Sequence, residues 1–321
     1  MRRVVSLAIA LTVVIAVIIV ENVAIAAFFP HLPRLTTDFS AAYFTREIKS
    51  MKQSTPQTLF LGDSVLWGYR IRGDQTAVSI LTSQGCTCRN LAFKSGNPPN
   101  DYFLTRLLLD AGVHPRAVVL DVNQAVLNQS SDYYQTLHPA VATLAKRFLT
   151  PQDRATLTIP FRDNAFHERL DTVLSSISQV YAMRSDIRAT LLGDTAAAPL
   201  PKLNPDVFAG TYDLLPLDNG NVGVRFLEAT VETWRRAGVP VLAFMTPTNH
   251  ELLHKYIDNA HYRANVSFLV KELSSRGARV IDLDRGFAAN EFLDNAHLTA
   301  AGQRRLAAKL EPWLQSAGSR T

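Results

Sequence analysis

The spacing of hydrophobic positions changes repeatedly along this chain, and most of the predicted elements follow from those changes. Short apolar runs predict five strands, at residues 59–61, 88–93, 117–122, 241–245 and 279–283. Helical spacing between them predicts helices at residues 78–84, 101–110, 222–237, 254–276 and 299–315. Strands that alternate with helical crossovers predict an α/β fold, with a parallel sheet flanked by helices in a flavodoxin-like, three-layer arrangement.

The alternation breaks between residues 130 and 221. This stretch contains helical segments at 139–148 and 166–184, and then a passage rich in Pro, Gly and Asp at 193–220. It contains no apolar run of the kind that predicts a buried strand. We therefore expect a helical insertion, a cap or arm carried by one main domain of residues 58–321.

The N-terminal pattern is of another kind. Arg2 and Arg3 precede an apolar run at residues 4–20, which Glu21 and Asn22 interrupt before it resumes at 23–29. The run exceeds the ~7–15 apolar residues of a signal peptide and approaches the ~17–25 that span a bilayer. Residues 1–29 are therefore predicted to be a signal anchor. Cleavage near residues 24–26 (AIA) is the alternative.

Either reading places the rest of the chain outside the cytoplasm, because the arginines that precede the apolar run stay inside. We expect a single-pass protein of a bacterial inner membrane with its main domain in the periplasm. Residues 30–57 carry two prolines and scattered basic residues, with a short helical stretch at 39–51, and are predicted to be a stalk.

Composition narrows the function classes. The 321 residues are 47% hydrophobic and 19% charged, which suits a sizeable core and argues against wholesale disorder. The net charge of +5 is spread out, without a basic block of the kind that follows a phosphate backbone, so we expect no nucleic-acid partner. Cys86 and Cys88 are the only cysteines, and their interpretations as small apolar residues, a local disulfide, or a redox or metal pair stay open.

Two short motifs carry the candidate chemistry. Ser64 follows Gly62 and Asp63 at the end of the first predicted strand, and Asp294 and His297 lie three residues apart before the last helix. A serine hydroxyl becomes nucleophilic when a base takes its proton and a carboxylate orients that base. These residues therefore predict ester hydrolysis or acyl transfer, although Asp63 and Ser64 are equally suited to capping a helix.

Four segments resemble the conserved blocks of the SGNH/GDSL hydrolase superfamily. They are residues 61–68 (LGDSVLWG), 90–97 (NLAFKSGN), 118–124 (VVLDVNQ) and 294–298 (DNAHL), the last followed by Gly302. The resemblance covers about residues 58–126 and 222–314, and it leaves out the predicted stalk and the insertion. It implies the SGNH variety of the parallel α/β fold.

The resemblance also implies site residues. Ser64 would be the nucleophile, His297 the general base, and Asp294 the residue that orients His297. The backbone amides of Ser64 and Gly96 would form the oxyanion hole together with the side chain of Asn123.

Other positions depart from the superfamily pattern or lie outside its blocks. Asp121 stands where the superfamily has glycine, and Gln124 where it has aspartate, which affects the expected pocket size and oxyanion geometry. Asn249 and His250 follow a predicted strand, so they are candidates for substrate contact. Nothing in the sequence indicates a metal or a cofactor.

The overall resemblance is to anchored SGNH-type proteins that act beside membrane-bound O-acyltransferases in envelope polysaccharide O-acetylation. It implies a serine esterase or O-acyltransferase that acts on acylated carbohydrate, with small esters as other substrates and a membrane-bound O-acyltransferase as a candidate partner. The alternatives are a GDSL-type lipase or general carboxylesterase, and a catalytically inactive scaffold in an export complex.

Overall fold

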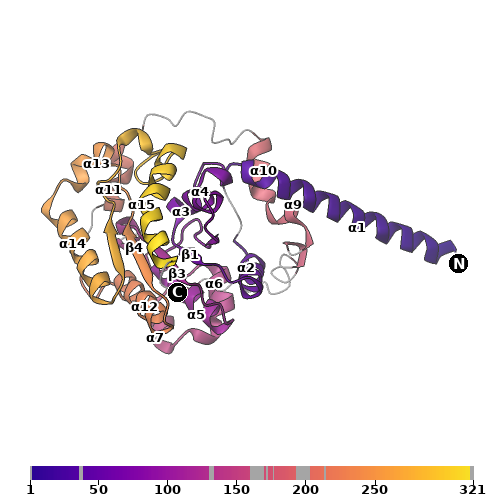
Figure 1. Ribbon diagram of the computed structural model, residues 1–321, viewed down its shortest axis with the longest axis horizontal. Helices are drawn as coiled ribbons and strands as arrows, with labels where there is room; N and C mark the ends of the chain where they lie inside the picture. Colours follow the sequence, from indigo (N-terminus) through magenta and orange to yellow (C-terminus); the bar gives the residue numbers. More distant parts are fainter. Residues whose placement is uncertain are drawn as a thin grey trace.

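A five-stranded parallel sheet lies at the centre of the protein in the computed structural model (Figure 1). The strands are β1 (Thr58–Leu61), β2 (Cys88–Asn90), β3 (Ala117–Val122), β4 (Val241–Met245) and β5 (Arg279–Asp282), in the order β2-β1-β3-β4-β5. This is the flavodoxin-like strand order, and it confirms the predicted fold class. The structure describes residues 2–35, 39–129, 134–159, 170, 173–175, 177–192, 203–212 and 215–318.

Helices cover both faces of the sheet, as right-handed crossovers require. On one face α4 (Ala77–Ser83) packs against α15 (Ala300–Gly318). On the other, α12 (Val222–Arg236) packs against α5 (Pro98–Asp110) and α14 (Ala260–Ser275). The three central strands are buried along their whole length, which explains why they read as continuous apolar runs.

The structure has two helices where the sequence predicts one. The segment at 254–276 belongs to α13 (His250–Ile257) and α14, with a break at residues 258–259. Asn259 causes the break, because its side chain accepts a hydrogen bond from the Tyr262 amide and so caps the start of α14.

The predicted stalk at residues 30–57 is only partly separate from the domain. Its helix, α2 (Ala41–Gln53), buries Phe44 and Met51 in the main core. Phe39 stacks on Phe44 and contacts Trp67 edge to face, beside the first motif. The stalk prediction is therefore wrong for this part, since α2 belongs to the domain.

The predicted insertion at 130–221 is spread over the molecule. Its first helices, α6 (Pro139–Ala145) and α7 (Pro151–Thr156), lie beside α5, and α6 also contacts α2. Next, α9 (Gln179–Ala182) and α10 (Arg184–Leu191) lie beside the N-terminal helix, whereas α11 (Ala209–Tyr212) lies by α13 (Figure 1). Parts of the predicted helix at 166–184 and of the passage at 193–220 fall outside the described residues.

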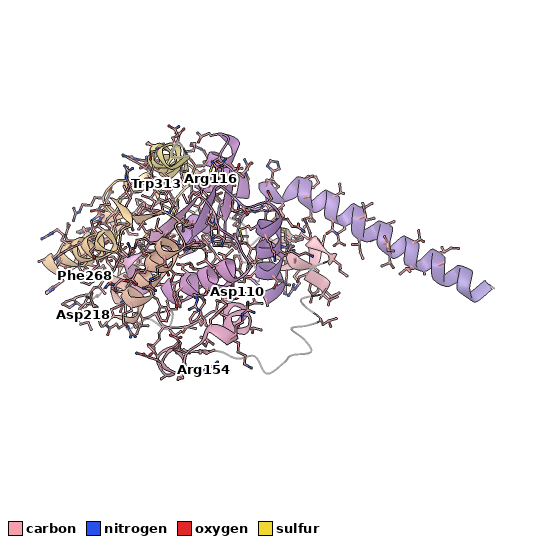
Figure 2. All side chains as sticks on the ribbon, turned by 60° about the horizontal axis from the view of Figure 1, so that its bottom comes forward. Asp110, Arg116, Arg154, Asp218, Phe268 and Trp313 are labelled. Carbon is pink, nitrogen blue, oxygen red and sulfur yellow. A yellow bond between two sulfur atoms is a disulfide. The ribbon has the colours of Figure 1, made fainter. Side chains whose placement is uncertain are left out.

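The N-terminal helix α1 (Arg2–Phe28) leaves the domain as a long rod (Figure 1), and its N-terminal part stands clear of the rest of the protein (Figure 2). Residues Ala8–His31 have a mean hydropathy of 2.6, and the described side chains of this span are not buried in the protein. By length and composition this segment is able to cross a membrane, a property that it shares with signal sequences. Away from this helix, Cys86 and Cys88 form a disulfide where the chain enters β2.

Candidate active site

The first motif places Ser64 at the end of β1. Ser64 is the first residue of the short helix α3 (Ser64–Trp67), and Asp63 caps that helix by accepting a hydrogen bond from the Val65 amide at 2.7 Å. Gly62 has a φ of +149°, and a Cβ there would lie 2.1 Å from Oδ1 of Asp121. The glycine is therefore required both by its backbone angle and by the approach of that carboxylate.

The second motif folds back on itself in the loop before α15. Oδ1 of Asp294 accepts hydrogen bonds from the amides of Ala296 and His297, at 3.1 and 2.9 Å. The amide of Leu293 donates to the carbonyl of His297 at 2.7 Å and closes the turn. This turn leaves Oδ2 of Asp294 beside the imidazole ring, 2.7 Å from Nδ1 of His297.

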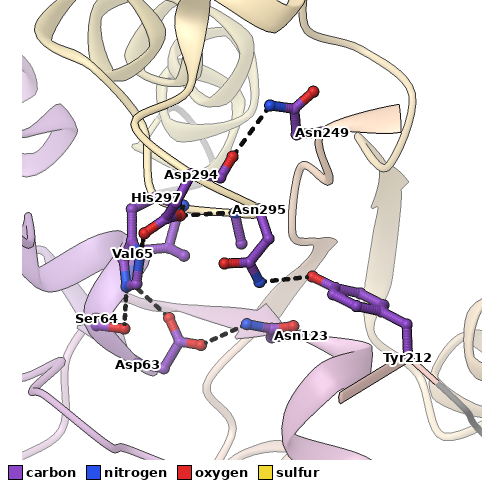
Figure 3. Close-up of polar contacts among 10 residues, drawn as sticks. Asp63, Ser64, Val65, Asn123, Tyr212, Asn249, Asp294, Asn295 and His297 are labelled. Atoms are coloured by element: carbon purple, nitrogen blue, oxygen red, sulfur yellow. Dashed lines mark hydrogen bonds and ion pairs between the residues drawn. The ribbon is translucent and has the colours of Figure 1, made fainter. Parts of the chain in front are cut away.

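The fold brings the two motifs together. Nε2 of His297 lies 2.8 Å from Oγ of Ser64, so a continuous chain of hydrogen bonds joins Ser64, His297 and Asp294 (Figure 3). When Nδ1 of His297 donates to Asp294, Nε2 is left as an acceptor for the Ser64 hydroxyl. This is the arrangement in which a histidine acts as a general base toward a serine.

The environment keeps Asp294 ionised. Burial alone would raise the pKa of Asp294, but hydrogen bonds from His297 and from the Ala296 amide outweigh it, and the pKa lies below its ordinary value. A charged carboxylate at this point stabilises the imidazolium that forms when His297 takes a proton. The ring of Tyr69 packs on His297 with its centroid 4.5 Å away and limits the motion of the imidazole.

The candidate oxyanion donors differ in their availability. The amide of Ser64, at the start of a helix, has no intrahelical acceptor. Asn123 donates through Nδ2 to Oδ2 of Asp63 at 2.7 Å, which orients its amide group and leaves its second N–H for a ligand (Figure 3). The amide of Gly96 instead donates to the carbonyl of Phe93 at 3.0 Å, so it reaches an oxyanion only after that bond breaks.

A group of buried carboxyls lies beneath these donors. Asp63, Asp101 and Asp121 line a cavity of about 10 Å³ together with Gly96 and Asn123. Asp121, at the position where the sequence resemblance would place glycine, accepts from the Asp63 amide with both oxygens at 3.2 Å. Burial, and then the charges of Asp63 and Asp101, raise the pKa of Asp121 well above its ordinary value. The side chain of Gln124, where the sequence resemblance would place aspartate, is also buried and makes no hydrogen bond within the described structure.

We expect Asp121→Asn to change the pH dependence of stability. The pKa of Asp121 is raised in the folded protein, so its contribution to stability is complete below the ordinary carboxyl pKa. That contribution is lost as the pH rises through the raised value. Asparagine still accepts from the Asp63 amide and does not ionise. The unfolding temperature of the variant should therefore gain on that of the unaltered protein as the pH rises above the ordinary carboxyl pKa. Asp110→Asn, at the exposed position labelled in Figure 2, is the control, and a pH-independent difference for Asp121→Asn would contradict this account.

The structure places Asn249 against the loop that carries Asp294 and His297, and His250 against Asp284. Nδ2 of Asn249 donates to the backbone carbonyl of Asp294 at 3.0 Å, and its Oδ1 caps α13. Nε2 of His250 lies 2.8 Å from Oδ2 of Asp284, whose other oxygen accepts from Tyr262. Asn249 thus uses both polar groups of its side chain within the protein and braces the loop that carries Asp294. Nδ1 of His250 is buried and makes no hydrogen bond within the described structure. Contact of Asn249 and His250 with substrate stays a prediction.

Further residues support the candidate site and were not predicted from the sequence. Tyr69 packs on His297, and Nδ2 of Asn295 donates to the hydroxyl of Tyr212 at 2.9 Å. The side chain of Gln303 joins α15 to α3 and α4, because its Nε2 donates to the Val65 carbonyl and its Oε1 accepts from the Ala77 amide. All these partners are distant in the chain, so no local pattern indicates them.

Comparison with known proteins gives matches among structures only. No protein-family model matches the sequence, and no curated protein matches it. A GDSL-like lipase from Bacteroides thetaiotaomicron is 8% identical with a TM-score of 0.44, covering 87% of this chain and all of that one. A G-D-S-L family lipolytic protein from Veillonella parvula is 9% identical with a TM-score of 0.40, covering 79% of this chain and 96% of that one. A lipolytic protein of the G-D-S-L family from Desulfitobacterium hafniense is 10% identical with a TM-score of 0.38, and the match covers 80% of this chain and 99% of that one. At these similarities the chemistry has to be inferred from the side chains of this chain.

Proposed function

We propose that this protein is an extracytoplasmic serine esterase or O-acyltransferase of the SGNH/GDSL type. The observation that carries the proposal is the chain of hydrogen bonds from Ser64 through His297 to Asp294. An accidental meeting of polar residues would not be expected to combine the serine, the base and the orienting carboxylate in this sequence of contacts. The Asp294 carboxylate, whose pKa is lowered, suits the orienting role.

The proposed reaction passes through an acyl-enzyme. Nε2 of His297 takes the proton of Ser64, and Oγ attacks the carbonyl carbon of the ester. The resulting oxyanion is stabilised by the Ser64 amide and the side chain of Asn123. His297 then gives its proton to the departing alcohol as the ester C–O bond breaks. Water or a sugar hydroxyl, deprotonated by His297, finally takes the acyl group from Ser64.

We expect Asn123→Ala to lower kcat, because it removes one candidate donor of the oxyanion hole. Loss of one oxyanion donor lowers kcat by about 10²–10³-fold in other serine enzymes. Here the alanine also removes the hydrogen bond to Asp63, so thermal unfolding of the variant should be measured beside its kinetics. Asn128→Ala is the control, because Asn128 follows the same strand and its side chain donates to the Gly210 and Thr211 carbonyls instead. A kcat within about threefold of the unaltered enzyme, set against that magnitude, would remove Asn123 from the site.

Carbohydrate O-acyl chemistry is the proposed use of the site. A cavity of about 360 Å³ is lined by Tyr212, Tyr256, Tyr262, Asn259, His261 and Lys255 among others, and its lining does not include the loop that carries Asp294 and His297. Tyr212 connects it to that loop through Asn295. Aromatic faces combined with amide and amine groups suit a ring that has both apolar and hydroxyl surfaces better than they suit a long acyl chain. The N-terminal helix would hold the enzyme where envelope polymers are made, near a membrane-bound O-acyltransferase as the proposed partner.

The length of the preferred acyl chain distinguishes this proposal from a lipase. A site for acetyl groups should give its highest kcat/KM with the C2 p-nitrophenyl ester, and longer chains should not improve it. A lipase pocket would gain up to about 0.8 kcal/mol for each buried CH₂, roughly fourfold in rate. Measurement of kcat/KM from C2 to C12, with Ser64→Ala as the blank, gives the slope. A steady rise to C8 or beyond would favour the lipase alternative and contradict carbohydrate O-acyl chemistry.

A further inference from the structure

Exposed apolar side chains gather where the N-terminal helix joins the domain. Outside α1 and the turn that follows it, eight large apolar side chains of the described residues are highly exposed, and six of them lie between residues 170 and 192. These six are Leu170, Val173, Ile177, Val180, Leu191 and Leu192. We call the described part of residues 170–192 the arm. Exposure concentrated in this way on one segment indicates a contact surface.

The arm is bonded to α1. Nδ2 of Asn22 donates to the carbonyl of Ile177 at 2.8 Å, and its Oδ1 accepts from the Gln179 amide at 2.7 Å. The hydroxyl of Ser178 donates to the carboxylate of Glu21. Glu21 and Asn22 are the two residues that interrupt the apolar run of α1. Their role in the structure is therefore to satisfy polar groups of the arm.

These bonds fix the level of the arm along α1. Asn22 precedes the end of α1 at Phe28 by six residues, which correspond to about 9 Å of helix. Val23 and Phe28, both largely exposed, lie between that level and the domain. A bilayer that receives Val23 and Phe28 therefore also reaches the arm. In Figure 1, α9 and α10 lie on the flank of the domain from which α1 projects.

One side of the arm is apolar and exposed, and the other side contacts the domain. Leu170, Val173 and Ile177 recur at three- and four-residue spacing, which in a helix places side chains on one face. Val180 follows in α9, beyond the extended residue Ser178, and is exposed as well. Ser175 is buried, and its carbonyl accepts from Arg46 of α2 at 3.2 Å, so the opposite side rests on the domain.

A polar rim accompanies this apolar face. The guanidinium of Arg184 lies 4.1 Å from the ring centre of Tyr181. Tyrosine and arginine are the residues that anchor a helix at the boundary between hydrocarbon and lipid headgroups.

We propose that the arm is a second membrane-contacting element, which lies in the outer interface of the bilayer beside α1. Val173, Ile177 and Val180 enter the lipid, and Tyr181 and Arg184 remain at the headgroups. With two points of contact the domain is held at a fixed tilt instead of swinging on a single helix. Lipid is the occupant because the apolar face of the arm continues the exposed apolar surface of α1, to which it is bonded. The inference rests on the proposed membrane anchor.

The test uses the full chain in nanodiscs of phosphatidylethanolamine and phosphatidylglycerol. Single cysteines at Val173 or Ile177 carry an environment-sensitive NBD label, under non-reducing conditions that keep Cys86 and Cys88 in their disulfide. We expect at least a twofold loss of NBD fluorescence when the lipids carry nitroxide groups near the headgroup. Val207→Cys is the matched control, since that valine is 75% exposed and precedes α11 on the other side of the molecule, and it should not be quenched.

A label at Val14→Cys, near the middle of α1, separates failure of the arm from failure of the anchor, and for this label the nitroxide is carried on the lipid acyl chain instead of near the headgroup. Quenching at position 14 without quenching at 173 and 177 overturns the inference, leaves the anchor in place and assigns the exposed face to a protein partner. Absence of quenching at position 14 overturns the anchor and the inference with it. Each labelled variant should hydrolyse p-nitrophenyl acetate like the unlabelled protein, which shows that it is folded.

Discussion

Ser64→Ala is expected to lower kcat/KM for acetyl esters by about 10⁴–10⁶-fold, the range over which loss of a nucleophilic serine acts in comparable enzymes. The alanine removes the oxygen that forms the acyl-enzyme. The remaining groups of the site can then assist only a direct attack of water on the ester. The site should stay folded, because the helix of Ser64 is held by its Asp63 cap and by Gln303, neither of which uses the serine hydroxyl. Unfolding temperatures of the variant and the unaltered protein should therefore agree closely.

Covalent labelling gives an independent measure of the same role. A fluorophosphonate should add its phosphorus to Oγ of Ser64, and mass spectrometry of the digested protein should find the adduct on the peptide with that residue. Ser79→Ala is a suitable control, because Ser79 donates to the Gly73 carbonyl and lies outside the hydrogen-bonded chain of the site. An enzyme that turns over esters without acquiring an adduct at Ser64 would use another nucleophile. A protein that neither reacts nor turns over esters would favour the inactive scaffold.

The sequence predicts the centre of this protein well because buried parallel strands carry a strong local signal. The apolar runs of β3 and β4 coincide with the observed strands, since both faces of those strands are covered by helices. Their order along the chain then determines which loops meet at the carboxyl edge of the sheet. For this reason Ser64, Asn123 and the loop with Asp294 and His297 could be expected to meet before any coordinates were known.

Features that depend on distant contacts are not predictable in this way. The burial of α2 rests on packing between Phe39, Phe44 and Phe93, and the sequence around α2 resembles any short amphipathic helix. Asn249 looks like a residue free to contact substrate, because nothing nearby in the sequence shows that the Asp294 carbonyl accepts its hydrogen bond. The direction of the Asp121 side chain likewise depends on the space that Gly62 leaves.

The interruption of the N-terminal apolar run shows the same dependence on tertiary contacts. In the sequence, Glu21 and Asn22 only make the membrane segment less regular. In the structure they hold Ser178 and Gln179, so their polarity serves the contact between α1 and the arm. Cleavage near residues 24–26 would remove both residues and expose the polar groups they satisfy. These contacts therefore favour an uncleaved anchor over a cleaved signal.

Asp294→Asn is expected to lower kcat by roughly 10⁴-fold, the effect that the same change has in serine enzymes with this type of triad. The side-chain oxygen of asparagine can keep the bonds from the Ala296 and His297 amides that Oδ1 now accepts. Its NH₂ group then faces Nδ1 of His297, which must become an acceptor and move its proton to Nε2. In that tautomer the imidazole cannot take the proton of Ser64. Steady-state kinetics with an acetyl ester measure the loss, and Asp258→Asn, at an exposed ion pair with Arg285, should leave kcat unchanged.

The same variant should reveal the carboxylate in the pH dependence of stability. The pKa of Asp294 is lowered in the folded protein, so its contribution to stability is present above the ordinary carboxyl pKa and is lost as the pH falls through the lowered value. Asparagine lacks this contribution at every pH. We therefore expect Asp294→Asn to unfold at a lower temperature than the unaltered protein at pH 7, and the difference to shrink toward pH 3. A difference that stays constant over this range would mean that the carboxylate charge does not stabilise the loop, and a kcat within tenfold of the unaltered enzyme would mean that Asp294 does not orient His297.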